Sequence, residues 1–313
     1  MSSLPQRDAF WNRVFDIAKK DRNIMVITAD MGAPSLDQFR KDLPAQFVNV
    51  GIAEQNAVTI AAGLALSGKK VFTYAIAPFI TLRCLEQIRV ESAIMGLPIT
   101  FVGVGAGFGY PDSGPTHHML EDIAIMRALP NIIIHSISDS VMAAAIGERS
   151  CGLKIANYVR LDRQLLPDLY DSATDFSPGL TVLKEGTDRF LVATGSMTTT
   201  ALAIARRLED RGLSLGVIDV HTFPLNAELF LRIVQSATKL VSIEEHFLAG
   251  GLGSAVCEVL NDNNRGSVQL ARIGLSMEQG FTGCYHYGGR DVLRKQYGLD
   301  DASLEQRIVR HFA

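Results

Sequence analysis

Cysteine is scarce in this chain of 313 residues, and its spacing is uninformative for metal or disulfide chemistry. The four cysteines, Cys84, Cys151, Cys257 and Cys284, lie far apart and form no CxxC pair. This argues against a disulfide framework and against a structural zinc site. Aromatic residues make up 7% of the chain and charged residues 20%, whereas 47% is hydrophobic. Such a composition is ordinary for a globular enzyme.

The chain also lacks an excess of positive charge. Its formal net charge is -3, and it has no polybasic run, so neither a nucleic acid nor a membrane surface is an expected partner. No apolar run approaches the roughly 20 residues that span a bilayer. The first residues, MSSLPQRDAFWNRVFD, carry charges where a signal peptide has its apolar core. We therefore expect a cytoplasmic enzyme or enzyme subunit.

Neither of the two glycine clusters completes a nucleotide-binding motif. The nucleotide-binding motif GxGxxG needs a third glycine. The cluster GVGAGFG (103–109) can be aligned with it in two registers, which place Phe108 or Tyr110 at that position. The cluster AGGLGSA (249–255) places Val256 there. The P-loop lysine is absent from both clusters. A nucleotide-dependent dehydrogenase is therefore disfavoured. The second cluster is expected to be a tight turn that opens a helix.

Short β-branched segments alternate with longer helical patterns, which predicts mainly parallel sheets covered by helices. A stretch rich in Pro, Asp and Ser at 164–180 lacks periodicity and is predicted to be a linker. We therefore predict two three-layer α/β domains, 1–170 and 171–313, with functional residues at the carboxyl ends of strands. The predicted strands are 24–28, 47–50, 71–75, 99–104, 132–135, 190–194, 215–220, 239–243 and 268–274, and the predicted helices are 53–67, 79–95, 139–150 and 197–211.

The stretch NVGIAEQNAVTIAAGLALSG (49–68) combines a carboxylate with apolar surroundings. After Asn56 almost every residue is apolar or small, which predicts a helix buried on all sides. Glu54 nevertheless lies in the first turn, and the stretch contains no basic residue that could neutralise its charge. A first-turn glutamate stabilises the helix dipole by ~0.3–1 kcal/mol, whereas a carboxyl group in apolar surroundings can share a proton with a ligand nitrogen. Composition and spacing alone favour the dipole role.

The segment GYPDSGPTHHMLED (109–122) places two adjacent histidines on a loop before a helix expected to start near Met119. Neighbouring histidines on a loop rarely reach one metal ion, and no HExxH pattern exists. Acid–base or hydrogen-bonding work is therefore the preferred functional interpretation, and simple loop histidines fit the residues equally well. Glu121 and Asp122 are expected to favour the positive end of the next helix.

Several stretches taken together resemble the transketolase family. They are GIAEQNAVTIAAGLAL (51–66), GPTHHMLEDIAIMRALPN (114–131) and YVRLDRQLLP (158–167), in this order. The resemblance covers nearly the whole chain but only the second half of a full transketolase. It implies a thiamine diphosphate pyrimidine-binding domain with a parallel sheet, followed by a transketolase C-terminal domain with a mostly parallel sheet. It also implies transfer of a two-carbon ketol unit from a ketose or ketose phosphate donor to an aldose acceptor.

The resemblance assigns cofactor roles to four residues. In this family the glutamate of the GIAE motif hydrogen-bonds the aminopyrimidine of thiamine diphosphate and so promotes loss of the thiazolium proton, which is the catalytic role implied for Glu54. Phe79 should pack on the pyrimidine ring, Asp30 should lie near the thiazolium, and Arg83 falls among the cofactor-binding residues. His117 resembles the catalytic histidine that contacts the reacting substrate.

Substrate residues follow from the same resemblance. Arg7, Ser35 and Arg163 fall where family members bind a sugar phosphate, and an arginine fork suits a phosphate dianion. Transketolases generally carry an aspartate directly before GPTH, where this chain has Ser113, with Asp112 one step earlier. We predict all five to be substrate-binding residues.

Further departures concern the sugar rather than the cofactor. His117 and His118 are both predicted to contact substrate, but Gly105 replaces a further histidine that family members usually carry. Leu82 lies near the place of a further cofactor-facing aromatic residue. We therefore expect altered substrate recognition with cofactor activation retained.

The family's metal motif is missing. Its members hold the diphosphate through Mg²⁺ on a GDG motif followed by an asparagine, and no GDG occurs in this chain. The resemblance therefore implies that a separate subunit carries the GDG motif and holds the diphosphate and Mg²⁺, with no metal ligands in this chain. Two copies of each subunit, an α2β2 assembly with this chain as a homodimer, are expected.

Other interpretations stay open at this point. The beta subunit of a 2-oxoacid dehydrogenase shares both domains and the glutamate. Deoxyxylulose phosphate synthase is another relative, because DVHTFPL (219–225) and VSIEEHFLAGGLG (241–253) resemble its C-terminal half. A non-catalytic assembly subunit with a decayed site is the alternative from a different class, and the presence of Glu54, Phe79 and His117 argues against it.

Overall fold

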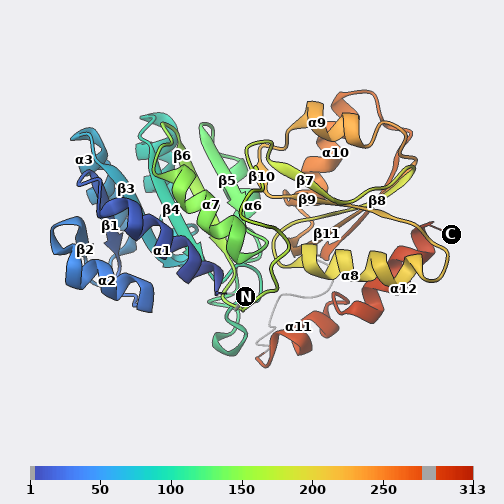
Figure 1. Ribbon diagram of the computed structural model, residues 1–313, viewed down its shortest axis with the longest axis horizontal. Coiled ribbons are helices and arrows are strands. Elements are labelled where there is room, and N and C mark those ends of the chain that lie inside the picture. Colours follow the sequence, from blue (N-terminus) through green and yellow to red (C-terminus); the bar gives the residue numbers. More distant parts are fainter. Residues whose placement is uncertain (1–3, 277–286, 313) are drawn as a thin grey trace.

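Two β-sheets form the centres of two α/β units in the computed structural model, which describes residues 4–276 and 287–312. Each sheet lies between two layers of helices, and the two units lie side by side along the long axis of the molecule (Figure 1). Two three-layer α/β units were predicted from the alternation of strand and helix patterns, and this prediction is confirmed. In the described part of the chain, no helix is long and apolar enough to cross a membrane.

The first sheet has the strand order β10-β5-β6-β4-β3-β1-β2. Its strands are parallel except for β10, which pairs antiparallel with β5. Strands β1, β4 and β6 are buried along their whole length, as expected for a parallel sheet that is covered on both faces. The bounds are β1 Ile24–Thr28, β2 Phe47–Asn49, β3 Lys70–Ile76, β4 Ile99–Val104, β5 Ile132–Ser136, β6 Ala156–Leu161 and β10 Thr222–Phe223.

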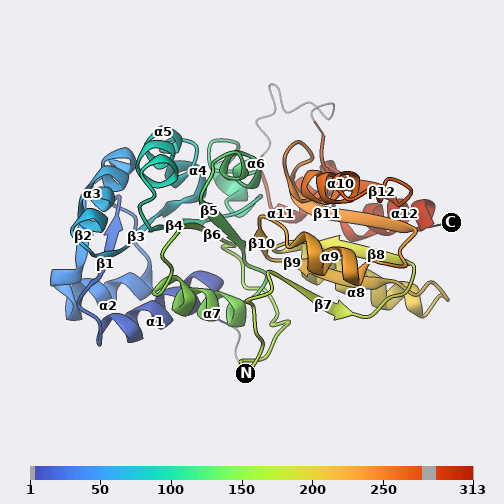
Figure 2. The same cartoon turned by 90° about the horizontal axis from the view of Figure 1, so that it is seen from above.

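Helices cover both faces of this sheet, as Figure 2 shows from above. Helices α1 (Gln6–Ala18), α2 (Pro34–Asp42) and α7 (Ser140–Ser150) pack on one face. The other face carries α3 (Glu54–Leu66), α4 (Ala77–Ile80), α5 (Leu85–Gln87), the π-helix η2 (Ile88–Ile94) and α6 (Asp122–Arg127), and short 3-10 turns occur at η1 (Pro44–Gln46) and η3 (Pro111–Ser113).

Two helix predictions need correction. The helix predicted at 79–95 is divided into α4, α5 and η2. The Thr81 hydroxyl donates to the carbonyl oxygen of Ala77 at 2.6 Å, and a threonine side chain that competes for a helix carbonyl helps to end α4. The helix expected to start near Met119 begins at Asp122, because Met119 instead forms a β-bridge with Gly107.

Helix α3 is not buried on all sides, contrary to the prediction. One face packs on the sheet, and the residues of the opposite face are exposed in the described part of the chain. The buried residues are Glu54, Ala57, Val58, Ala61 and Ala62, and the exposed ones are Gln55, Asn56, Thr59, Gly63 and Leu66. The hydrophobic pattern was therefore right, but part of it points to solvent in the isolated chain.

The second sheet has the order β12-β11-β8-β9-β7, parallel except for β7, which runs antiparallel to β9. The predicted linker at 164–180 forms no helix or strand before β7 begins at Leu180. The strands are β7 Leu180–Lys184, β8 Arg189–Ala193, β9 Gly216–Val220, β11 Lys239–Phe247 and β12 Gln269–Leu275; α8 (Met197–Glu209), α11 (Arg290–Gln296) and α12 (Asp301–Phe312) lie on one side, and α9 (Ala227–Ile233) and α10 (Leu252–Asp262) on the other.

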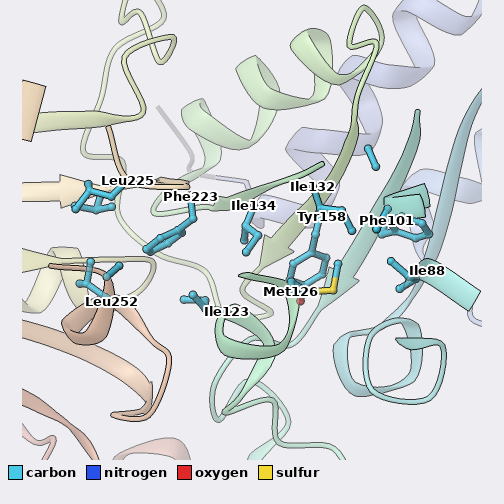
Figure 3. Packing of buried hydrophobic residues seen from close by; sticks show 14 of the residues in the cluster. Ile88, Phe101, Ile123, Met126, Ile132, Ile134, Tyr158, Phe223, Leu225 and Leu252 are labelled. Atoms are coloured by element: carbon cyan, nitrogen blue, oxygen red, sulfur yellow. The ribbon is translucent and has the colours of Figure 1, made fainter. Parts of the chain in front are cut away.

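A hydrophobic cluster of buried residues spans the two units. Figure 3 shows Phe223, Leu225 and Leu252, which follow the linker in sequence, in line with Ile123 and Ile134 of the first unit. Strand β10 adds a short segment from beyond the linker to the edge of the first sheet. The units are thus joined by packing as well as by chain connectivity.

Candidate active site

The predicted cofactor and substrate residues follow the carboxyl ends of neighbouring parallel strands. Asp30 follows β1, Glu54 follows β2, Phe79 follows β3, His117 follows β4 and Arg163 follows β6. Because these strands are parallel and adjacent, all five residues are brought to one edge of the first sheet. Functional residues were expected at strand ends, and the topology agrees.

Arg7 reaches the same edge by a different route, because α1 precedes every strand. The buried Gln6 side chain donates to the carbonyl oxygen of Ile137 at 3.1 Å and accepts from the backbone N–H of Asp162 at 2.7 Å. Ile137 and Asp162 come directly after β5 and β6. Gln6 therefore fixes the start of α1, and Arg7 with it, at the carboxyl ends of these strands.

Glu54 is paired with a cation that lies outside its own stretch of sequence. Nη1 of Arg83, 29 residues later, donates to Oε2 of Glu54 at 2.6 Å. The Glu54 side chain is 5% exposed and that of Arg83 is 42% exposed. The Arg83 guanidinium also stacks on Phe79, with Cζ 4.2 Å from the ring centroid. Arg83 is thus the residue that neutralises Glu54 in this structure.

The contacts continue from Phe79 toward the predicted sugar-binding residues. The His117 ring lies 5.1 Å from the Phe79 ring and 6.1 Å from the Tyr110 ring, measured between centroids. Cζ of Arg163 lies 4.6 Å from the Tyr110 centroid. A continuous series of contacts, here called the contact row, therefore comprises Glu54, Arg83, Phe79, His117, Tyr110 and Arg163.

Arg7 and Ser35 meet at a carboxylate that sequence analysis did not single out. Nε and Nη2 of Arg7 donate to Oδ1 and Oδ2 of Asp8 at 2.9 and 3.3 Å. The Ser35 hydroxyl donates to Oδ1 of Asp8 at 3.2 Å. Burial alone would lower the pKa of Arg7, but the interactions with Asp8 and Tyr74 together outweigh it and the pKa is raised. The charge of Arg7 is largely balanced by Asp8.

Tyr110 is the second residue that sequence analysis missed as a member of the site. Its ring packs against the backbone of Gly105, the position where family members usually carry a histidine: a Cβ atom there would lie 2.2 Å from Cδ2 of Tyr110. Burial raises the pKa of Tyr110, and the positive charge of Arg163 opposes this. Position 105 and the tyrosine five residues later form one unit, which explains the glycine.

Besides Arg7 and Ser35, four predicted residues lie outside the contact row. His118 is buried with its ring 5.1 Å from that of Phe108, and burial lowers its pKa. Asp112 and Ser113 lie in the short turn η3 of the same loop. Asp30 is exposed, and its Oδ1 accepts from Nδ2 of Asn49 at 3.2 Å. Their predicted roles stay predictions.

The glycine clusters have structural explanations. Oε2 and Oε1 of Glu244 accept from the backbone N–H groups of Leu252 and Gly253 at 2.6 and 2.9 Å, which caps the start of α10. A Cβ atom at Gly251 would lie 2.0 Å from Oε2 of Glu244, and one at Gly107 would lie 2.1 Å from Oε1 of Glu245. The predicted tight turn that opens a helix is confirmed. In both clusters, a glycine without a side chain leaves room for a buried carboxylate.

The side chains of the contact row fit an aminopyrimidine but no metal ion. One carboxylate oxygen of Glu54 and the ring face of Phe79 already hold a planar group with N–H donors, the Arg83 guanidinium. Within residues 4–276 and 287–312, no group of three or more His, Cys, Asp or Glu side chains is suited to bind a metal ion. The side chains of the contact row therefore fit the pyrimidine end of thiamine diphosphate.

Comparison with known proteins assigns the class. Residues 2–168 match the family model "Transketolase, pyrimidine binding domain", and residues 179–304 match "Transketolase, C-terminal domain". The chain belongs to the transketolase family, as its motifs implied.

Individual relatives agree with this assignment. An apulose-4-phosphate transketolase subunit of Phocaeicola vulgatus is 34% identical over 95% of this chain and 94% of its own length. The 6-deoxy-6-sulfo-D-fructose transketolase subunit SqwH of a Clostridium species is 32% identical over 94% and 90%. A solved structure described as "Split gene transketolase, inactive beta4 tetramer" is 30% identical, covers 99% of this chain and 98% of its own, and has a TM-score of 0.86. The chain thus corresponds to the second subunit of split transketolases.

Proposed function

We propose that this chain is one subunit of a thiamine diphosphate-dependent enzyme that transfers a two-carbon ketol unit from a ketose to an aldose, and that it acts only with a separate diphosphate-binding subunit. The observation that carries the proposal is the contact row. It places a buried carboxylate, an aromatic ring, a histidine and an arginine side by side at the carboxyl edge of the sheet.

Four members of the row have a defined task in this reaction. Thiamine diphosphate, when bound, supplies an electron sink for the carbanion that forms when a ketose carbon–carbon bond breaks. Glu54 holds a proton at its carboxyl oxygen and donates it in a hydrogen bond to a ring nitrogen of the aminopyrimidine, and Phe79 packs on the ring. Nδ1 of His117 already contacts the Thr116 hydroxyl at 2.9 Å, which leaves Nε2 to form a hydrogen bond with a sugar hydroxyl. Arg163 binds the far end of the sugar.

The exposed surface beside Glu54 supports a partner subunit. Within the described residues, six of the ten exposed large hydrophobic side chains lie on or next to α3 and on the segment 82–95, which packs against it. Monomeric proteins rarely expose such a concentration of apolar side chains unless another protein covers it. We call this surface the apolar face; it consists of Ile52, Leu66, Leu82, Val90, Ile94 and Met95.

The test is reconstitution. This chain is purified alone and mixed with a transketolase subunit that carries the GDG motif, with thiamine diphosphate and Mg²⁺, and ketose donors are screened against aldose acceptors. Ketol transfer is expected only in the mixture, and Glu54→Ala should abolish it. Strong turnover by this chain alone would refute the need for a partner. Full activity of the Glu54→Ala complex would favour a non-catalytic role, and a requirement for a lipoyl-domain protein would favour a 2-oxoacid dehydrogenase.

A further inference from the structure

Arg83 contacts both groups that are proposed to bind the aminopyrimidine, the Glu54 carboxylate and the Phe79 ring. Its Nη1 lies 2.6 Å from Oε2 of Glu54, and its Cζ lies 4.2 Å from the Phe79 ring centroid. Glu54 is almost fully withdrawn from solvent. A cofactor that uses the same oxygen and the same ring face therefore has to compete with a residue of the chain itself.

The guanidinium resembles an aminopyrimidine in the properties that this site recognises. Both are planar and both stack on aromatic faces, and the carboxylate that accepts from the guanidinium is the group that is proposed to share a proton with the ring nitrogen of the aminopyrimidine. A charge-assisted bond to a buried carboxylate is among the stronger hydrogen bonds in proteins. The intramolecular contact also needs no loss of translational freedom, which a free ligand has to overcome.

Of the two partners in this ion pair, Arg83 is the one able to move. Glu54 lies in the first turn of α3 with its carboxylate buried. Arg83 lies in the turn between α4 and α5, and its long side chain is 42% exposed. A change of Arg83 rotamer can free Glu54 and Phe79 without disturbing a helix.

We propose that Arg83 closes the pyrimidine half-site of the isolated subunit and has to release Glu54 and Phe79 before cofactor binds. This inference rests on the proposed cofactor. The apparent affinity of the isolated chain is then reduced by the fraction of molecules in which the arginine contact is open. Assembly with the partner favours the open state if the partner or the diphosphate end of the cofactor binds that state more tightly.

The experiment measures thiamine binding to the isolated chain by calorimetry, since thiamine carries the aminopyrimidine without the diphosphate. Arg83→Met retains much of the side-chain length and removes the charge and the donors. It is expected to bind thiamine at least about tenfold more tightly than the wild type. Arg89→Met removes an exposed arginine from the neighbouring helix η2 and should leave the affinity unchanged. Equal or weaker binding by Arg83→Met overturns the proposal.

A second variant and a second measurement guard against misfolding. Arg83→Ala should reproduce the gain, and circular dichroism should show native helix content in both variants. A crystal structure of the assembled complex with cofactor should place Arg83 Nη1 beyond hydrogen-bonding distance of Glu54. If thiamine binds neither the wild type nor the variants, the closing role of Arg83 is refuted, whereas the proposed function is still decided by ketol transfer in the reconstituted complex.

Discussion

The ring of Tyr110 lies so close to the backbone of Gly105 that a Cβ atom at position 105 would come within 2.2 Å of Cδ2 of the tyrosine. The same tyrosine touches His117 on one side and Arg163 on the other. Gly105 also has a positive φ of 95°, which L side chains rarely adopt. Any side chain at position 105 therefore displaces the ring in the middle of the contact row.

Gly105→Ala should destabilise the protein by about 2 kcal/mol or more, because backbone strain and the clash with Tyr110 add. The control is Gly212→Ala, where φ is 83° but no atom lies within 4 Å of the new Cβ, so that only the strain of about 1 kcal/mol is expected. Urea unfolding measures both. Equal losses in the two variants would show that Tyr110 moves aside without cost.

The buried carboxylate of Glu245 connects the two units, directly through Phe108 and indirectly through Arg290. Arg290 donates to both Glu245 and Asp162, at 2.7 Å from each, and Glu245 also accepts from the backbone N–H of Phe108 at 2.6 Å. Burial alone would raise the pKa of Glu245, but Arg290 and Arg294 lower it to about 2. The carboxylate therefore stays ionised inside the protein and holds the loop after β4.

Glu245→Gln should cost about 3–5 kcal/mol of unfolding free energy, because it leaves buried arginine charge without its partner. Glu148→Gln is the matched control, since Glu148 pairs with Arg13 at 2.6 Å but is 57% exposed. Its loss should stay below about 1 kcal/mol. Chemical denaturation of the isolated chain checks both values, and a loss for Glu245→Gln as small as the control would contradict the argument.

The strands, and the edge of the sheet at which the site lies, could be predicted from the sequence. Segments of β-branched residues identify parallel strands, and parallel strands bring the residues that follow them to one edge of the sheet. Glu54, Phe79, His117 and Arg163, whose roles the family resemblance implied, follow such strands. The two-residue strand β10 carries no periodic pattern, since its pairing with β5 depends on how the second unit packs.

Side-chain partners were the part that could not be predicted. Arg83 meets Glu54 from 29 residues away, and Asp8 meets Ser35 from 27 residues away. Each pairing depends on rotamers and on how helices dock, neither of which a local pattern encodes. The exposed face of α3 was missed for a related reason: small and apolar residues look alike whether they pack on this chain or on another.

Two buried histidines at the junction of the units predict a pH dependence. Burial lowers the pKa of His135 to about 3 and that of His221 to about 4. As the pH falls below about 6.5, the unfolded chain binds a proton at each histidine and the folded chain does not. Each therefore removes about 1.4 kcal/mol of stability per pH unit until its folded pKa is reached.

His221→Asn removes one of these two titrations. It should reduce the slope of unfolding free energy against pH by about 1.4 kcal/mol per pH unit between pH 6.5 and 4. The comparison is between the slopes of unfolding free energy against pH for wild type and variant, which is independent of any uniform loss of stability. Parallel slopes would show that His221 takes up its proton in the folded state as readily as in the unfolded chain.

Asp8 places a negative charge against Arg7 and Ser35, which are predicted to bind the phosphate of a sugar. A phosphate group bound there meets like-charge repulsion of the order of 1–2 kcal/mol at a partly exposed position. In the reconstituted enzyme, Asp8→Asn should therefore raise the ratio of kcat/KM for a phosphorylated sugar over the same sugar without phosphate by about tenfold.

Asp16→Asn provides the control for this charge change. Asp16 lies on the same helix α1, pairs with Lys19 and is 56% exposed. Its removal should leave the ratio unchanged. If Asp8→Asn also left the ratio unchanged, the phosphate of the substrate would not bind near Arg7.

The apolar face predicts which surface meets the partner subunit. Ile94 is 61% exposed at the end of η2, and a carboxylate placed there would be buried without a counter-charge when the partner binds. Ile94→Asp should weaken assembly by at least about tenfold, measured by analytical ultracentrifugation of the mixed subunits. Val292→Asp, at a valine that is 60% exposed on α11 of the other unit, should leave assembly intact. Because both substitutions add the same charge to equally exposed positions, an equal effect in the two variants would mean that the partner does not bind over α3 and η2.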